Sequence, residues 1–105
     1  VCTETADTFA DGMACRMPAA EALEIIAEGA ARIARVDDGE IRRAIVALHE
    51  DTHNTAEGAG AAALAAAIQE RALNAGERIA VVLSGANIDR RVLAEILADH
   101  ARCSD

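Results

Sequence analysis

Two short glycine-containing stretches carry the side chains best suited to binding a ligand. The first, Ser84–Asn87, reads Ser-Gly-Ala-Asn and follows an apolar run from Ile79 to Leu83. The second, Glu57–Gly60, reads Glu-Gly-Ala-Gly and opens an alanine-rich run. A hydroxyl at the carboxyl end of a buried strand, beside a glycine that permits close backbone approach, is typical of ligand sites in α/β proteins. Asn87 is also suited to capping the helix that follows.

A third stretch, His49–His53, reads His-Glu-Asp-Thr-His and matches the HExxH pattern of zinc peptidases. In that pattern two histidines one helical turn apart bind zinc, and the glutamate polarises a water molecule. A third protein ligand is required, and the chain has one further histidine, His100. The apolar stripe of the surrounding helix leaves Glu50 and His53 toward solvent. Zinc peptidase is therefore a remote alternative, and we assign no metal ligands.

Length and charge limit the classes of protein to consider. The 105 residues suffice for one domain, so we treat 1–105 as a single domain or a fragment of one. A formal charge of −8 disfavours nucleic acid and anionic membrane surfaces as partners. The sequence has no signal-peptide pattern and no apolar run long enough to cross a membrane, so we expect a cytoplasmic protein. Three widely spaced cysteines without CxxC spacing are expected to be reduced thiols.

Apolar periodicity and capping signals predict about four helices. The best specified begins with a capping box formed by Asp37 and Glu40 and continues from about Asp38 to His53. Its apolar positions recur at the helical period, at Ile41, Ala44, Ile45, Leu48 and Thr52. The other helices are expected over Ala19–Glu28, over Ala61–Leu73, and from Asn87 to about His100.

The run from Arg78 to Leu83 is predicted to be a strand. Its apolar residues are nearly continuous, as in parallel strands that are covered on both faces. A second short strand or a connector is expected over Ala31–Val36, and residues 1–17, which lack helical periodicity, are expected to be extended or looping. The predicted fold class is therefore α/β and helix-rich, with one or two strands and about four helices.

Three motifs carry a resemblance to a known family. They are Thr8–Gly12 (Thr-Phe-Ala-Asp-Gly), Glu57–Ala62 and Leu83–Asp89. Their order and spacing are similar to the C-terminal portion of the catalytic unit of threonine dehydratase (threonine ammonia-lyase), a fold-type II pyridoxal-phosphate enzyme related to serine racemase and tryptophan synthase β. The resemblance extends from about Asp7 to Asp89. It implies that the chain is a fragment of a fold-type II catalytic unit.

The resemblance implies cofactor-binding roles for three residues. The hydroxyl of Ser84 would lie beside the pyridine nitrogen of pyridoxal 5'-phosphate. Because a neutral hydroxyl does not protonate that nitrogen firmly, the ring is a weaker electron sink, and elimination of a β-hydroxyl is favoured over transamination. Glu57 resembles the glutamate behind the cofactor ring, and Gly85 the glycine that lets the ring pack against the turn. The implied parent reaction converts L-threonine or L-serine to a 2-oxo acid and ammonia.

The chain departs from the family pattern in two respects. Family members usually read Ser-Gly-Gly-Asn, whereas Ala86 here places a methyl group near the ring pocket. The ten basic residues are all arginine, so no lysine is present to form the Schiff base, and a guanidinium cannot replace it. The glycine-rich phosphate loop belongs to the family's N-terminal portion. We therefore expect no catalytic residues here, no activity of the chain alone, and no pyridoxal phosphate bound by this chain alone.

A non-enzymatic α/β interaction module that acts through an oligomer interface is the alternative interpretation. In either case a lone strand would expose edges that are normally paired. We therefore expect a homo-oligomer formed by strand pairing or helix exchange between copies.

Overall fold

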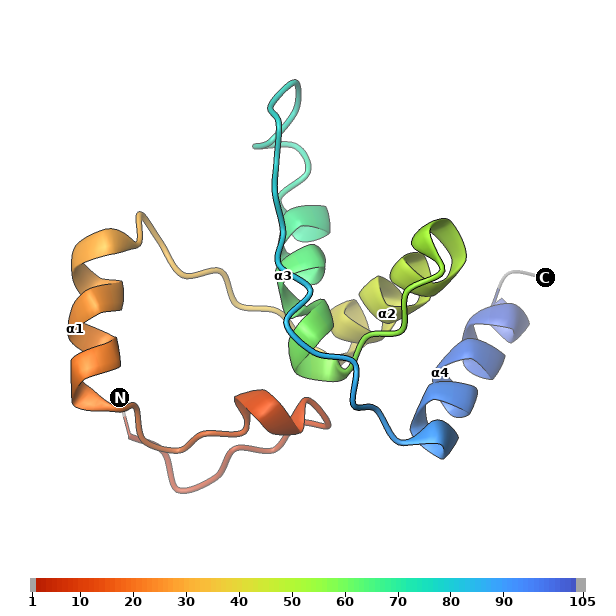
Figure 1. Ribbon diagram of the computed structural model, residues 1–105, viewed down its shortest axis with the longest axis horizontal. Coiled ribbons are helices and arrows are strands. Elements are labelled where there is room, and N and C mark those ends of the chain that lie inside the picture. The colour runs from red at the N-terminus through yellow and green to blue at the C-terminus, as the bar shows by residue number, and fades with distance from the viewer. Residues whose placement is uncertain (1, 104–105) are drawn as a thin grey trace.

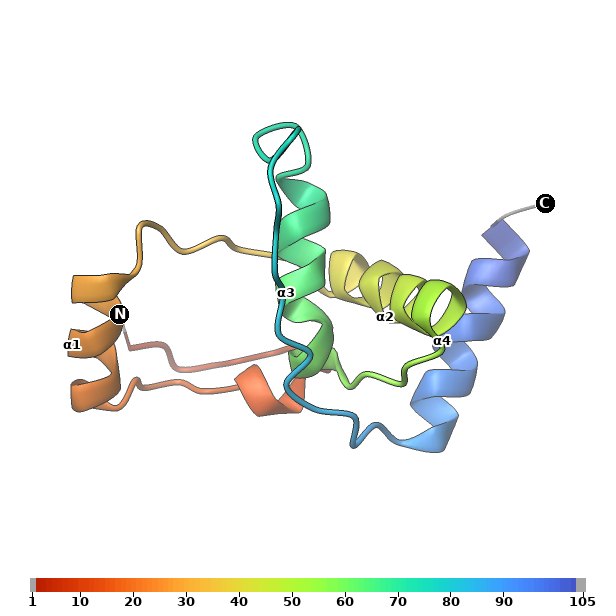
Figure 2. The same ribbon diagram turned by 45° about the horizontal axis from the view of Figure 1, so that its top comes forward.

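A computed structural model describes residues 2–103 of the chain. The part of the chain described contains helices and extended segments (Figure 1). Helices α2, α3 and α4 lie together, whereas α1 stands apart from them in both views (Figures 1 and 2). In chain order the elements are the 3-10 turn η1 (Asp11–Met13), α1 (Ala20–Gly29), α2 (Asp38–Thr52), α3 (Gly58–Gln69) and α4 (Arg90–Cys103).

Helix α2 begins at the predicted capping box. The Asp37 carboxylate accepts a hydrogen bond from the Glu40 backbone N–H at 2.7 Å, and the Glu40 carboxylate accepts one from the Asp37 N–H at 2.8 Å. These two bonds satisfy N–H groups that have no partner within the helix. The helix ends at Thr52, because His53 adopts a left-handed conformation with φ of 56°. The predicted helix is confirmed, with its C-terminal end one residue earlier than expected.

The core lies between α2, α3 and α4. Four of the five predicted apolar positions of α2 are buried, and Ile45 is fully enclosed. The fifth, Thr52, is exposed, and its hydroxyl donates to the Leu48 carbonyl at 2.6 Å instead. Small side chains let α3 approach α2 closely, since Ala61 and Ala65 are both buried. The buried apolar residues are Ala10, Ile41, Ala44, Ile45, Val46, Leu48, Ala56, Ala61, Ala65 and Ile96.

Residues 79–83 are extended, but the described part of the chain shows no strand there or at 31–36. The helix-rich part of the predicted fold class is confirmed, and its one or two strands are not. A strand requires a hydrogen-bonded neighbour, and within residues 2–103 no backbone group of 79–83 has one. The segment instead runs alongside α3 in both views (Figures 1 and 2), with Ile79 52% and Val82 74% exposed.

Helix α1 is exposed along its whole length. Its apolar stripe faces solvent, with Leu23 45%, Ile25 72% and Ile26 46% exposed. The helix packs against none of the other helices, so only its own hydrogen bonds and residue preferences support it within the described chain. The sequence predicted this helix within one residue at either end, because its signals are local.

The segment between α1 and α2 is fastened to the C-terminal end of α3. The Arg32 guanidinium forms a bidentate ion pair with the Glu70 carboxylate at the surface. The Gln69 amide donates to the Arg35 carbonyl at 2.9 Å and to the Glu40 carboxylate at 3.0 Å.

No helix in the described chain is both long and apolar enough to span a membrane.

Candidate functional site

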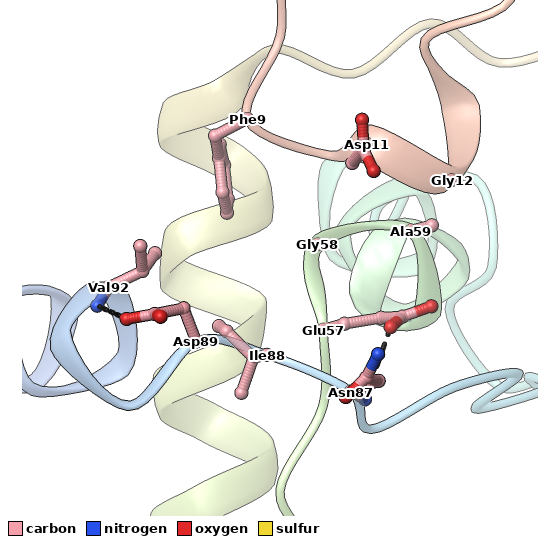
Figure 3. Close-up of a pocket in the computed structure, with 10 residues that line it drawn as sticks. All are labelled: Phe9, Asp11, Gly12, Glu57, Gly58, Ala59, Asn87, Ile88, Asp89 and Val92. Atoms are coloured by element: carbon pink, nitrogen blue, oxygen red, sulfur yellow. Dashed lines mark hydrogen bonds between the residues drawn. The ribbon is translucent and has the colours of Figure 1, made fainter.

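Glu57 sits at the N-cap of α3 and connects that helix to the turn after residues 79–83. Its backbone N–H donates to the Gly85 carbonyl at 3.1 Å. Its carboxylate accepts from the Asn87 N–H at 3.1 Å, the contact drawn as a dashed line in Figure 3. The helix dipole favours a carboxylate at this position. Two of the three predicted site residues, Glu57 and Gly85, are therefore in direct contact.

Glycines lie on both sides of this contact, and the one at position 60 has the least room for a side chain. A methyl group on Gly85 would lie 2.7 Å from the Glu57 Cδ atom, so the end of that side chain would have to move. A methyl group on Gly60 would lie 2.9 Å from the backbone nitrogen of Gly85. Gly60 therefore lets the first turn of α3 lie directly against the backbone of Gly85.

Ser84 precedes this contact and is exposed. Its hydroxyl makes no hydrogen bond to any residue in the range that the structure describes, so it can bond to a ligand. The bond between Gly85 and Glu57 fixes the backbone immediately after the serine. The structure therefore brings all three predicted residues to one place at the start of α3.

Asn87 does not cap the last helix, contrary to the sequence prediction. Helix α4 begins at Arg90, and the cap is Asp89, whose carboxylate accepts from the Arg91 N–H at 2.7 Å. An aspartate is as good a cap as an asparagine, and its position next to the helix decides between them. The backbone N–H of Asn87 is instead used at the site, where it holds the Glu57 carboxylate.

A pocket of about 400 Å³ opens beside Glu57. One wall comes from residues 8–13, which we call the N-terminal arm and which include η1. A second wall is the start of α3, and a third is the chain leading into α4 (Figure 3). Three carboxylates from these separate parts line it, those of Asp11, Glu57 and Asp89.

The sequence interpretation assigned no role to Asp11 or Gly12. Both belong to the first of the three motifs, and that membership was the available signal. A methyl group on Gly12 would lie 3.0 Å from the Ala59 Cβ atom, so the N-terminal arm approaches α3 closely at the pocket. The sequence does not reveal the contact between Gly12 and Ala59, so it could not place the Thr8–Gly12 motif beside Glu57.

The HExxH stretch does not form a metal site in the structure described. His53 lies past the end of α2, and its ring nitrogen Nδ1 faces the His49 carbonyl at 3.3 Å. The left-handed backbone of His53 removes it from the helical register that the zinc pattern requires. Across residues 2–103 no group of three or more His, Cys, Asp or Glu side chains could hold a metal ion.

The chain belongs to the family of pyridoxal-phosphate dependent enzymes, whose model matches residues 1–85. Within that class it is similar to two curated L-threonine ammonia-lyases. It is 38% identical over 90 residues to the protein of Geobacter sulfurreducens and 34% identical over 90 residues to that of Thermotoga maritima. Each match covers 86% of this chain and 22% of the relative. The chain thus spans about a fifth of the length of these relatives.

The residues around Glu57 fit one side of a pyridoxal phosphate site. The exposed hydroxyl of Ser84, which has no hydrogen-bond partner within residues 2–103, suits a heterocyclic nitrogen. Two further parts of such a site are absent from this chain. It contains no lysine, and neither Glu57–Gly60 nor Ser84–Asn87 follows a strand within residues 2–103, as a phosphate loop would.

Proposed function

We propose that this chain forms the pyridine side of the cofactor site in an enzyme that deaminates L-threonine or L-serine by β-elimination. The observation that carries the proposal is the junction of Ser84, Gly85 and Glu57 at the start of α3. Family membership and the two L-threonine ammonia-lyase relatives support it. Bound pyridoxal phosphate supplies the electron sink that β-elimination requires.

In this proposal Ser84 positions the cofactor through one neutral hydrogen bond to its ring nitrogen. The hydroxyl has no charge with which to hold a proton on that nitrogen. Glu57 orients the turn through its bonds to Gly85 and Asn87, so the serine is presented by a fixed backbone.

We also propose that the chain alone is inactive and needs further polypeptide for its chemistry. The covalent attachment of pyridoxal phosphate requires a lysine amine, which this chain does not contain. A phosphate group requires a cradle of backbone N–H groups, usually a glycine-rich loop at a helix N-terminus. In this proposal residues 1–105 are one part of a larger catalytic unit, and the chain alone binds no pyridoxal phosphate.

The proposed assembly is a cytoplasmic homo-oligomer without nucleic acid or membrane as a partner. Exposed apolar side chains at residues 79–83 lie on a backbone whose N–H and C=O groups have no partner within residues 2–103, which favours strand pairing between copies. The formal charge of −8 disfavours polyanionic partners.

The test is a chimeric enzyme in which this chain replaces the matching 90-residue segment of the Geobacter protein. We expect the chimera to bind pyridoxal phosphate and to release ammonia and a 2-oxo acid from L-threonine. Replacing Ser84 by Ala should lower kcat/KM by about five- to tenfold, because one hydrogen bond is worth roughly 1–1.4 kcal/mol. Thr55→Ala, at an exposed loop position, is the matched control and should leave activity unchanged.

Two results would count against the proposal. A chimera that folds and binds pyridoxal phosphate but loses nothing on Ser84→Ala would remove the serine from the site. A chimera that folds but binds no cofactor would favour the second candidate, a non-enzymatic interaction module. The observation that favours this second candidate is the exposed apolar face of α1, because exposed apolar patches are typical of interaction surfaces.

A further inference from the structure

The N-terminal arm reaches the Glu57 pocket from a distant part of the sequence, and one carboxylate on α2 holds it there. Asp38 is the first residue of α2 and is half-buried. One of its oxygens accepts from the Thr8 hydroxyl at 2.5 Å, and the other lies 3.4 Å from the Phe9 N–H. The Thr8 oxygen in turn accepts from the Ala10 N–H at 3.1 Å. These bonds shape the arm and attach it to the helix.

The side chain of Asp38 takes no part in the capping box of α2. The two bonds of the capping box use Asp37 and Glu40, and neither involves the Asp38 side chain. Both oxygens of the Asp38 carboxylate instead contact the N-terminal arm, at Thr8 and Phe9. Farther along α2, the Arg42 guanidinium lies 4.8 Å from the centre of the Phe9 ring and supports the same segment from the side.

The placement of the arm matters because its fit against α3 is tight. Ala10 is 1% exposed, and a methyl group on Gly58 would lie 2.8 Å from the Ala10 Cα atom. Gly12 meets Ala59 with similarly little space. A shift of the arm by a few tenths of an ångström therefore changes the wall that faces Glu57 across the pocket (Figure 3).

We infer that Asp38 is a positioning residue for the pocket, which holds the N-terminal arm against α3 so that Asp11 and Gly12 form the wall opposite Glu57. The inference goes beyond the proposed function, because neither Ser84 nor Gly85 lines this pocket. The placement of the wall does not depend on which ligand enters. Asp38 touches no reacting group and acts through Thr8 and Phe9.

The experiment measures amide hydrogen exchange in the 105-residue chain, with no cofactor present. Asp38→Asn keeps the size of the side chain but replaces one acceptor oxygen by a donor group, which cannot accept from the arm. Exchange at Ala10 and Met13 should become about tenfold faster or more, because hydrogen bonds to charged groups are the stronger ones. The amides of α2 from Ile41 to Leu48 should keep their protection.

Two further variants separate positioning from a general loss of stability. Thr8→Val removes the hydroxyl at constant shape and should reproduce the effect of Asp38→Asn, whereas Thr8→Ser retains the hydroxyl and should restore slow exchange. Asp51→Asn removes one negative charge at an exposed position near the other end of α2 and controls for the change in net charge. The amide signals of Gly12 and Ala59 should shift with Asp38→Asn and not with Asp51→Asn.

The inference is overturned if Asp38→Asn leaves the exchange of the arm unchanged. It is equally overturned if protection falls together in the arm and throughout α2, since Asp38 would then support the fold as a whole. Neither result depends on cofactor binding. A failure of the proposed function in the chimera and a failure of this inference can therefore be told apart.

Discussion

Replacing Gly60 by Ala tests the close contact on which the candidate site depends. In most helices this substitution stabilises, by up to about 1 kcal/mol, because alanine restricts the unfolded chain and suits the helix. Here the new methyl group would lie 2.9 Å from the Gly85 nitrogen and 3.1 Å from its carbonyl carbon. These are backbone atoms, so no side-chain rotation relieves the overlap.

The expected result is therefore a loss of stability. Forcing an extra methyl group into a packed contact costs about 1–3 kcal/mol. If the turn moves away, the bond between the Glu57 N–H and the Gly85 carbonyl is also lost, at roughly 0.5–1.5 kcal/mol. Set against the helical gain, the net loss of unfolding free energy is about 0.5–3.5 kcal/mol.

The assay is urea unfolding followed by far-ultraviolet circular dichroism. Ala63→Gly on the same helix is the calibrating variant, because Ala63 is exposed and reports helix preference alone. It should destabilise by about 1 kcal/mol or less. If Gly60→Ala instead raises stability by a similar amount, then space exists at Gly60, and the backbone contact between α3 and the Ser84 turn is not as described.

Three further changes test other features of the structure. Asp37→Ala should lower the unfolding free energy by about 1 kcal/mol through loss of the capping box, and Asp37→Ser should restore most of it in the same urea assay. The hydrogen bond from Arg32 lowers the pKa of Glu70 below its ordinary value of 4.5, so the pair stabilises the fold above that pH and stops doing so as the pH falls through the lowered pKa. Glu70→Gln should therefore reduce stability at neutral pH and make no difference in strong acid, as seen in unfolding midpoints across pH; a constant difference would contradict this. Val82→Lys places a charge on the most exposed large apolar residue of the 79–83 segment and should reduce self-association in light scattering, whereas a chain already monomeric at high concentration would refute the expected oligomer.

The helices could be predicted from the sequence because their signals are short-range. The Asp37 and Glu40 pair and the apolar positions from Ile41 to Leu48 lie within a few turns of one another, and the structure confirms both. The strand predicted from Arg78 to Leu83 rests on a different kind of signal. Strand formation depends on a neighbouring strand, and none of the segments described here supplies one.

The candidate site could be predicted only in part, for a related reason. Ser84, Gly85 and Glu57 were recognised from the motifs that contain them, and the structure places them together. Two contacts at the same site depend on spatial rather than sequence proximity. Asp89 caps α4 because the helix begins directly after it, at Arg90. The N-terminal arm forms a wall of the pocket because Thr8 is bonded to Asp38 on α2.

The bond between Glu57 and Gly85 also makes the intervening polypeptide a closed loop. The loop leaves the site along α3, turns at residues 74–77 and returns to its starting point along 79–83 (Figures 1 and 2). Its two ends are locked together, whereas the distant tip is exposed and its Gly76 has open space around it. Because closing a loop becomes only slowly more costly as the loop lengthens, residues added at the tip should leave the Ser84 turn in place. The tip is therefore the place where a tag, a label or an inserted domain would report on this protein without disturbing its site.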